Sequence, residues 1–260
     1  MIDDFFNILL PQASLGIFIL AQLVLSSIAT PRHYDFARLL TLIGLFTTTL
    51  VLLTVDTEPQ YFGFNKSVVS DNYTILFHLV ILLCSLFVAT LTNRLANTLK
   101  KNAFTIQALF LTAVLGALCI ISANDFLTLF VSIELMAFPT YFLIACAKGY
   151  HAKEASFKYL ITNAVSTGFF LLGVSYMYGI TSSLNFSVIY ETMAEADSAL
   201  IYTVSSLLII AGLVSKLSLF PFANWVIDVY KGTETSILAY LSTIPKLAMF
   251  GIICRLLVFP

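Results

Sequence analysis

Long apolar runs constrain this 260-residue chain more than any other feature of its sequence. A transmembrane helix needs about 20 apolar residues to cross a hydrocarbon layer of about 30 Å. Runs near this length occur at residues 8–29, 39–55, 75–91, 104–122, 126–147, 159–180, 200–230 and 236–259. The runs lack the polar and apolar alternation of barrel strands, so we expect helices. The sequence therefore predicts an all-α, polytopic transmembrane bundle of about eight helices.

The composition excludes the other main classes of protein. Hydrophobic residues make up 59% of the chain and charged residues only 10%, whereas soluble domains carry about a quarter charged residues. This apolar composition makes lipid the expected surrounding of the chain. The net charge of −1 gives no electrostatic footprint for nucleic acid. The 4 cysteines lie singly in apolar runs, without a Cys-x-x-Cys motif or a neighbouring histidine. We therefore expect no metal or iron–sulfur site in this chain.

The basic residues of the loops alternate between the two sides of the predicted membrane. Lys and Arg accumulate on the cytoplasmic or matrix side. Alternate loops hold nearly all of them: Arg32, Arg38, Arg94, Lys100, Lys101, Lys148, Lys153, Lys158 and Lys231. The opposite loops hold Lys66 and most of the acidic residues. This alternation predicts eight crossings with both termini outside. The acidic start, with Asp3 and Asp4, is unlike a secretory signal or transit peptide, so we expect the first run to stay in the mature protein.

Three charged residues lie deep inside these apolar runs. Glu134 and Lys246 lie about 12 Å and 15 Å into their segments, and Lys216 lies midway along the seventh. Each would cost about 2.5 to 3.5 kcal/mol at the centre of a helix in lipid. Arg255 lies near the outer end of the last run, where its side chain could snorkel to the interface. Charges at the membrane midplane need a partner or water, and usually mark a functional site.

A proline accompanies each of the three midplane charges. Pro139 and Pro221 each follow a charge by five residues, and Pro245 directly precedes the third. A helical proline leaves the carbonyl four residues earlier without its hydrogen bond, and such breaks are tolerated in a membrane only where they face protein or a wet cavity. We therefore predict a proline-broken seventh helix and a polar, hydrated layer at mid-membrane. Several hydroxyls are available to line it: Thr128, Ser132, Thr162, Ser166, Ser215, Ser218, Ser242 and Thr243.

Glu134 and Lys216 together suggest a proton switch. Burial favours neutral lysine, whereas a carboxylate about 4 Å away favours protonated lysine by roughly 4 kcal/mol at an effective dielectric of 20. Moving Glu134 toward or away from Lys216 would decide whether the lysine keeps its proton, and Lys246 could receive that proton through water and hydroxyls. The alternative is a structural pair that merely holds two helices together. Lys158, beside Glu154 at the inner end of the sixth helix, is equally open to a surface role.

Four stretches of the sequence resemble the antiporter-like subunits of respiratory complex I. Residues 212–232 read GLVSKLSLFPFANWVIDVYKG and resemble the broken seventh helix of that family. Residues 244–256, which contain Lys246, are most similar to subunit 2, called subunit N in bacteria. Residues 124–139 resemble the fifth helix of the family, and residues 154–159 resemble the start of the sixth. The resemblance covers about residues 124–256.

The resemblance implies a role in proton transfer for each matched residue. Glu134 and Lys216 would be the carboxylate and lysine pair, Lys246 the central lysine of the eighth helix, and Lys158 a supporting inner lysine. Such subunits translocate protons within NADH:ubiquinone oxidoreductase, an enzyme whose redox chemistry takes place elsewhere. This chain is accordingly expected to bind no cofactor, with NADH, flavin, iron–sulfur clusters and ubiquinone bound by other subunits.

Family members usually have about fourteen crossings in two inverted repeats. Residues 1–103 would then be an N-terminal three-helix segment, and residues 104–260 the first antiporter-like repeat, with helices four to eight. We expect the N-terminal half of a split subunit, with a second chain supplying the missing half and other membrane-arm subunits of complex I as partners. The expected location is an energy-coupling membrane, the mitochondrial inner membrane being favoured over a bacterial plasma membrane. Two alternatives remain open, namely a cation/proton antiporter subunit and a structural membrane subunit that does not pump.

Overall fold

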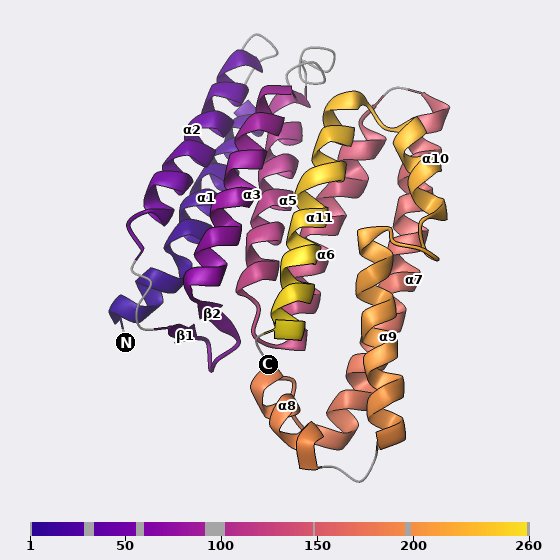
Figure 1. Ribbon diagram of the computed structural model, residues 1–260. Helices are drawn as coiled ribbons and strands as arrows, with labels where there is room; N and C mark the ends of the chain where they lie inside the picture. The colour runs from indigo at the N-terminus through magenta and orange to yellow at the C-terminus, as the bar shows by residue number, and fades with distance from the viewer. Residues whose placement is uncertain are drawn as a thin grey trace.

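The structure is a computed structural model that describes residues 2–28, 34–55, 60–91, 102–147, 149–195 and 199–258. Within this part of the chain, 8 helices are long and apolar enough to cross a membrane. They are α1 (Ile2–Ile28), α2 (Tyr34–Leu52), α3 (Asn72–Leu91), α5 (Ala103–Ser122), α6 (Phe126–Ala145), α7 (Tyr150–Thr181), α9 (Ala199–Leu217) and α11 (Thr235–Val258). α1 begins and α11 ends at the same end of the bundle, as an even number of crossings requires (Figure 1). The predicted all-α, polytopic bundle is confirmed.

The seventh predicted run forms two helices. α9 ends at Leu217, and the short helix α10 (Asn224–Gly232) begins after an interruption that contains Pro221. Proline has no backbone N–H and clashes with the preceding turn, so it disturbs the middle of a helix. Pro139 and Pro245, by contrast, lie within the continuous helices α6 and α11. Of the three midplane prolines, all of them described, Pro221 alone coincides with a break.

The two ends of the bundle differ in structure and in charge. β1 (Tyr61–Gly63) and β2 (Val68–Ser70) form an antiparallel hairpin. Figure 1 shows this hairpin and the short helix α8 (Phe186–Glu195) at one end, called here the hairpin end, and α10 toward the other, called the α10 end. Lys66 lies in the turn of the hairpin, whereas Lys153 and Lys231 lie at the start of α7 and the end of α10. Five basic residues of the predicted inner loops lie outside the described residues, namely Arg32, Arg94, Lys100, Lys101 and Lys148.

Glycines allow two pairs of helices to approach closely. A Cβ atom added at Gly116 of α5 would lie 2.4 Å from the backbone nitrogen of Met136 in α6. A Cβ atom added at Gly212 of α9 would lie 2.8 Å from the carbonyl oxygen of Ser166 in α7. Any larger residue would force these backbones apart. The contact at Gly212 also places Lys216, one turn further along α9, against the same part of α7.

Candidate functional site

Lys216 is the penultimate residue of α9 and is half-buried. The last carbonyls of a helix have no partner within the helix, and together they carry partial negative charge. A cation in the last turn is therefore stabilised. The interruption after Leu217 creates this helix end in the middle of a predicted crossing, so the break and the lysine are parts of one arrangement.

Two polar side chains of α7 accept hydrogen bonds from Lys216. The Nζ atom donates to Thr167 Oγ1 at 3.0 Å and to Asn163 Oδ1. Asn163 and Thr167 are four residues apart and so share one face of α7. Both are at least nine-tenths buried. Asn163 in turn donates from its amide to the hydroxyl of Tyr141 in α6.

Glu134 lies near the middle of α6 and reaches the same threonine. Thr167 Oγ1 donates to Glu134 Oε1 at 2.8 Å, while it accepts from Lys216. Among the described residues, Glu134 and Lys216 form no ion pair within 4.0 Å. The predicted pair is therefore joined through a hydroxyl instead of by direct contact. We call Glu134, Asn163, Thr167 and Lys216 the lysine cluster.

A small cavity lies between the lysine cluster and α11. Its volume is about 20 Å³, enough for about one water molecule. Polar groups line its α7 and α9 walls, and Ser166 and Ser215 form a hydrogen bond of 2.6 Å there. The full lining is Ile133, Met136, Ala137, Tyr159, Thr162, Asn163, Ser166, Ser215, Lys216, Trp225, Pro245 and Met249. The cavity thus extends from Lys216 to the residue directly before Lys246.

Lys246 lies midway along α11 and is half-buried. Within the described part of the chain it forms no hydrogen bond and no ion pair. Its Nζ atom lies 5.6 Å from the ring centroid of Tyr230, which belongs to α10. The cavity lined by Lys216 also contacts Pro245, the residue before Lys246. Lys246 itself has no described hydrogen bond to the lysine cluster.

Lys158 lies outside the lysine cluster, toward the α10 end of α7. Its Nζ atom forms ion pairs with Glu154 at 2.9 Å and with Asp228 of α10 at 2.8 Å. All three side chains are more than a third exposed. The hydrogen bond and charge of Lys158 lower the pKa of Asp228 below its ordinary range. The structure gives Lys158 a definite contact, which ties α10 to α7.

Most of the hydroxyls expected to line a proton path bond to their own helices. Ser132 and Thr243 donate to backbone carbonyls four residues earlier, as hydroxyls in membrane helices commonly do. Ser166, Ser215 and Thr162 do line the cavity. Thr167 and Asn163, which the sequence analysis missed, contact Lys216 directly. Their spacing on one helix face is the one signal that could have identified them.

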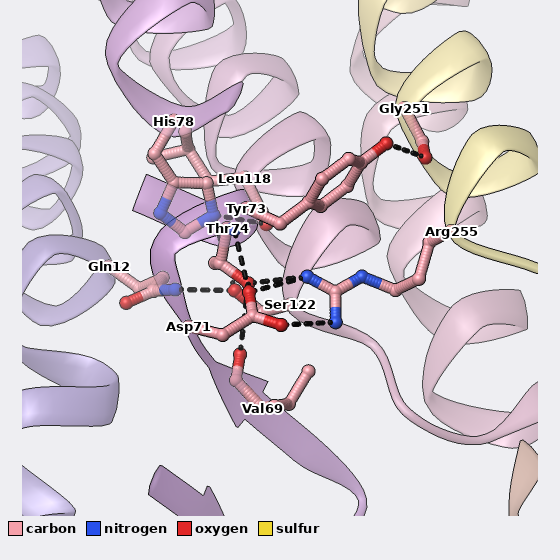
Figure 2. Close-up of polar contacts among 10 residues, drawn as sticks. All are labelled: Gln12, Val69, Asp71, Tyr73, Thr74, His78, Leu118, Ser122, Gly251 and Arg255. Carbon is pink, nitrogen blue, oxygen red and sulfur yellow. Dashed lines mark hydrogen bonds and ion pairs between the residues drawn. The ribbon is translucent and has the colours of Figure 1, made fainter. Parts of the chain in front are cut away.

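A second polar group lies at the hairpin end, where Asp71 precedes α3. Figure 2 shows the carboxylate of Asp71 facing the guanidinium of Arg255 in α11. Nη2 lies 2.8 Å from Oδ1 and Nη1 lies 3.1 Å from Oδ2, while Nη2 also donates to Thr74 Oγ1 at 2.7 Å. Arg255 is only 5% exposed. The prediction that Arg255 snorkels to the interface is wrong, because its side chain turns into the bundle toward Asp71. We call Asp71, Thr74 and Arg255 the arginine clamp.

Further hydrogen bonds connect the surroundings of the arginine clamp to other helices. The hydroxyl of Tyr73 donates to the carbonyl of Gly251 in α11 at 2.6 Å. His78 Nε2 lies 2.9 Å from the carbonyl oxygen of Leu118 and 3.2 Å from Ser122 Oγ, both in α5 (Figure 2). Burial alone would raise the pKa of Asp71, but its bonds to the clamp partners outweigh burial and lower that pKa below the ordinary 3.8. These contacts hold the ends of α3, α5 and α11 together.

A family model matches the part of the chain that holds the lysine cluster. Residues 123–260 match the family described as NADH:quinone oxidoreductase/Mrp antiporter, TM. The match covers more than half of the 260 residues and includes each of the four predicted site residues.

Individual relatives agree with the family match. The chain is 35% identical over 213 residues to NADH-quinone oxidoreductase subunit N 2 of Rhizobium meliloti, covering 81% of this chain and 43% of the relative. It is 30% identical over 254 residues to NAD(P)H-quinone oxidoreductase subunit 2 of Rippkaea orientalis, covering 96% and 49%. A chain of respiratory complex I from Thermus thermophilus has the same fold, with a TM-score of 0.80, 28% identity, and coverage of 94% and 52%. The chain spans about half the length of the relatives that it matches.

Proposed function

The chain belongs to the NADH:quinone oxidoreductase/Mrp antiporter membrane-subunit family, and on that premise we propose that it is a proton-translocating membrane subunit of an NADH:quinone oxidoreductase. It is a multi-pass protein of an energy-coupling membrane. The relatives named above are oxidoreductase subunits, which favours this function over cation/proton antiport. The chain spans about half the length of subunit N relatives, and we propose that it corresponds to the N-terminal half.

The hydrogen-bonded series from Lys216 through Thr167 to Glu134 is the observation that carries the proposal. A hydroxyl that accepts from an ammonium and donates to a carboxylate can reverse both roles when the charges change. The two bonds of 3.0 Å and 2.8 Å hold Nζ and Oε1 at most about 6 Å apart. At this distance and an effective dielectric of 20, two unit charges attract by roughly 3 kcal/mol. A shift of Glu134 would therefore change how firmly Lys216 holds its proton.

The cavity supplies the next step of the proposed route. A lysine that releases its proton needs an acceptor within hydrogen-bond reach. One water molecule in the cavity would have polar partners in Asn163, Ser166 and Ser215, which is the setting that buried water requires. The proton would leave Lys216 Nζ for this water, and a proton of the water would pass toward Lys246 Nζ. In this route Lys158 has an indirect role, because its ion pair with Asp228 holds α10 against α7.

The remaining expectations follow from the size and chemistry of the enzyme complex. Flavin, iron–sulfur clusters and the NADH and quinone sites would belong to other subunits, and further membrane-arm subunits would surround this one. Two expectations from the sequence stay predictions. The first is a second chain that supplies the missing half, and the second is the mitochondrial inner membrane as the location of this protein. Mass spectrometry of the purified complex tests the first of these, because a second chain with further apolar segments should copurify.

Replacement of Lys216 tests the proposed function directly. The variant Lys216→Met in the assembled complex should lower the proton-to-electron ratio measured in sealed vesicles during NADH oxidation, because methionine carries no proton. The matched control is Lys66→Met, at an exposed lysine in the hairpin turn. A normal ratio in Lys216→Met, at wild-type levels of assembly, would contradict the proposal.

A further inference from the structure

We propose that Tyr230 is a further residue of the proton route, and that its aromatic ring holds the protonated form of Lys246. This inference rests on the proposed function. Tyr230 would act as a positioning residue for the lysine, because it touches the ammonium group without exchanging a proton. The geometry that supports it lies on two different helices, α10 and α11.

Lys246 needs such a partner because the described chain offers it no other. Among the residues that the structure describes, no carboxylate lies within ion-pair distance of its Nζ atom, and no oxygen accepts a hydrogen bond from it. The ring of Tyr230, with its centroid 5.6 Å away, is within the usual range for a cation–π contact. The negative face of the ring attracts an ammonium group but not a neutral amine. Tyr230 therefore favours the protonated state of Lys246.

The hydroxyl of Tyr230 does not account for the position of its side chain. This oxygen is buried and has no hydrogen-bond partner among the described residues. A buried hydroxyl without a partner is unfavourable. The ring, by contrast, packs against the hydrophobic core and faces Lys246. The ring, and not the hydroxyl, is thus the part of Tyr230 that interacts with Lys246.

The helix that carries Tyr230 is fixed on α7, independently of Lys246. Asp228, two residues before Tyr230, pairs with Lys158 of α7 at 2.8 Å. Gly232, two residues after it, is so close to α7 that an added Cβ atom would lie 2.5 Å from the carbonyl oxygen of His151. α9, with Lys216, also packs on α7. Tyr230 therefore presents its ring to α11 from the same group of helices that holds the lysine cluster.

Two substitutions at Tyr230 separate the ring from the hydroxyl in the assembled complex. Tyr230→Leu removes the ring, and should lower the rate of proton translocation at constant NADH oxidation by about 2- to 30-fold, the range for loss of a cation–π contact. Tyr230→Phe keeps the ring and should restore most of that rate. Wild-type translocation in Tyr230→Leu would overturn the inference. A loss in Tyr230→Phe as large as in Tyr230→Leu would also overturn it, since the hydroxyl would then be the active part.

A graded series guards against a simple failure of Tyr230→Leu to assemble. Phenylalanines with increasing numbers of ring fluorines, placed at position 230, keep the shape of the ring but weaken its negative face. Translocation should fall stepwise along the series, and a flat response would overturn the inference. Lys216→Met serves as the reference for the proposed function. If Lys216→Met and Lys246→Met lower the proton-to-electron ratio but the ring series does not, the inference about Tyr230 fails while the proposed function stands.

Discussion

The lysine cluster and the arginine clamp each combine an acid, a base and a threonine, but only the clamp joins its acid and base by direct contact. In the clamp, Arg255 bonds both carboxylate oxygens of Asp71 directly. The hydroxyl of Thr74 adds a second link, because it accepts from Arg255 and donates to Asp71. In the lysine cluster, the hydroxyl of Thr167 links acid and base, and no direct ion pair joins these two described residues. Arginine does not lose its proton in proteins, whereas a buried lysine can. The comparison indicates that the clamp fixes helices, and it agrees with the proposal that the lysine cluster changes its charge.

Removal of the arginine should have the largest effect on stability. Arg255→Met leaves the largely buried carboxylate of Asp71 without its charged partner, and breaking a fully buried ion pair in this way costs about 3 to 5 kcal/mol, which is the upper value here. The melting temperature of this chain, measured during thermal unfolding of the purified complex, should be lower in Arg255→Met than in the wild type. The double variant Arg255→Met with Asp71→Asn removes both charges and should recover part of it. Equal stability of wild type and Arg255→Met would contradict a structural role for the clamp.

Removal of the bridging hydroxyl should have a smaller effect on stability but a clear one on function. Thr167→Val keeps the shape of the side chain and leaves a donor of Lys216 and an acceptor of Glu134 unpaired, at a cost of about 1 to 3 kcal/mol. We expect a lower proton-to-electron ratio, because the two charges lose their connection. Thr167→Ser retains the hydroxyl and serves as the matched control. The comparison between the two regions fails if valine and serine give the same ratio.

The smallest expected effect is the response of the clamp to acid. The folded chain lowers the pKa of Asp71 below 3.8, so the stabilisation is fully present above that value and is lost as the pH falls through the folded pKa. The difference in melting temperature between wild type and Asp71→Asn should be constant near neutral pH and shrink at pH values below about 4. A difference that stays constant down to strongly acidic pH would show that the charge of Asp71 is not what stabilises the clamp.

The length of the apolar runs was enough to predict the crossings, but not where every helix begins. α7 begins at Tyr150 instead of at residue 159, since Lys153, Glu154 and Lys158 interrupt the apolar run without interrupting the helix. These residues are good helix formers and need only reach water with their side chains. The interruption at Pro221 was predicted because proline acts on the backbone locally. The division of the chain at residue 103 into a three-helix segment and a repeat stays a prediction.

The residues of the candidate site were predictable only where their chemistry is rare in a membrane. Glu134, Lys216 and Lys246 stand out because charges inside apolar runs are costly. Thr167 and Asn163 do not, because polar uncharged residues are common in such helices and their partners depend on how α7 is rotated. The role of Arg255 was missed for a similar reason, since Asp71 lies far away in the sequence and only the packing of α3 against α11 brings the two together.

The glycine contacts at Gly212 and Gly116 bear on how fast the lysine cluster can respond. α9 cannot slide on α7, nor α6 on α5, without separating backbones that already touch. Rearrangements of whole helices take microseconds to milliseconds, whereas side chains change rotamer within picoseconds to nanoseconds where they have room. Glu134 belongs to one of these helix pairs and Lys216 to the other. The two residues can therefore approach by rotation about their own side-chain bonds, or by movement of one pair against the other. If the proposed function holds, side-chain rotation alone would allow exchange within nanoseconds, whereas movement of one helix pair against the other would set a pace of microseconds to milliseconds.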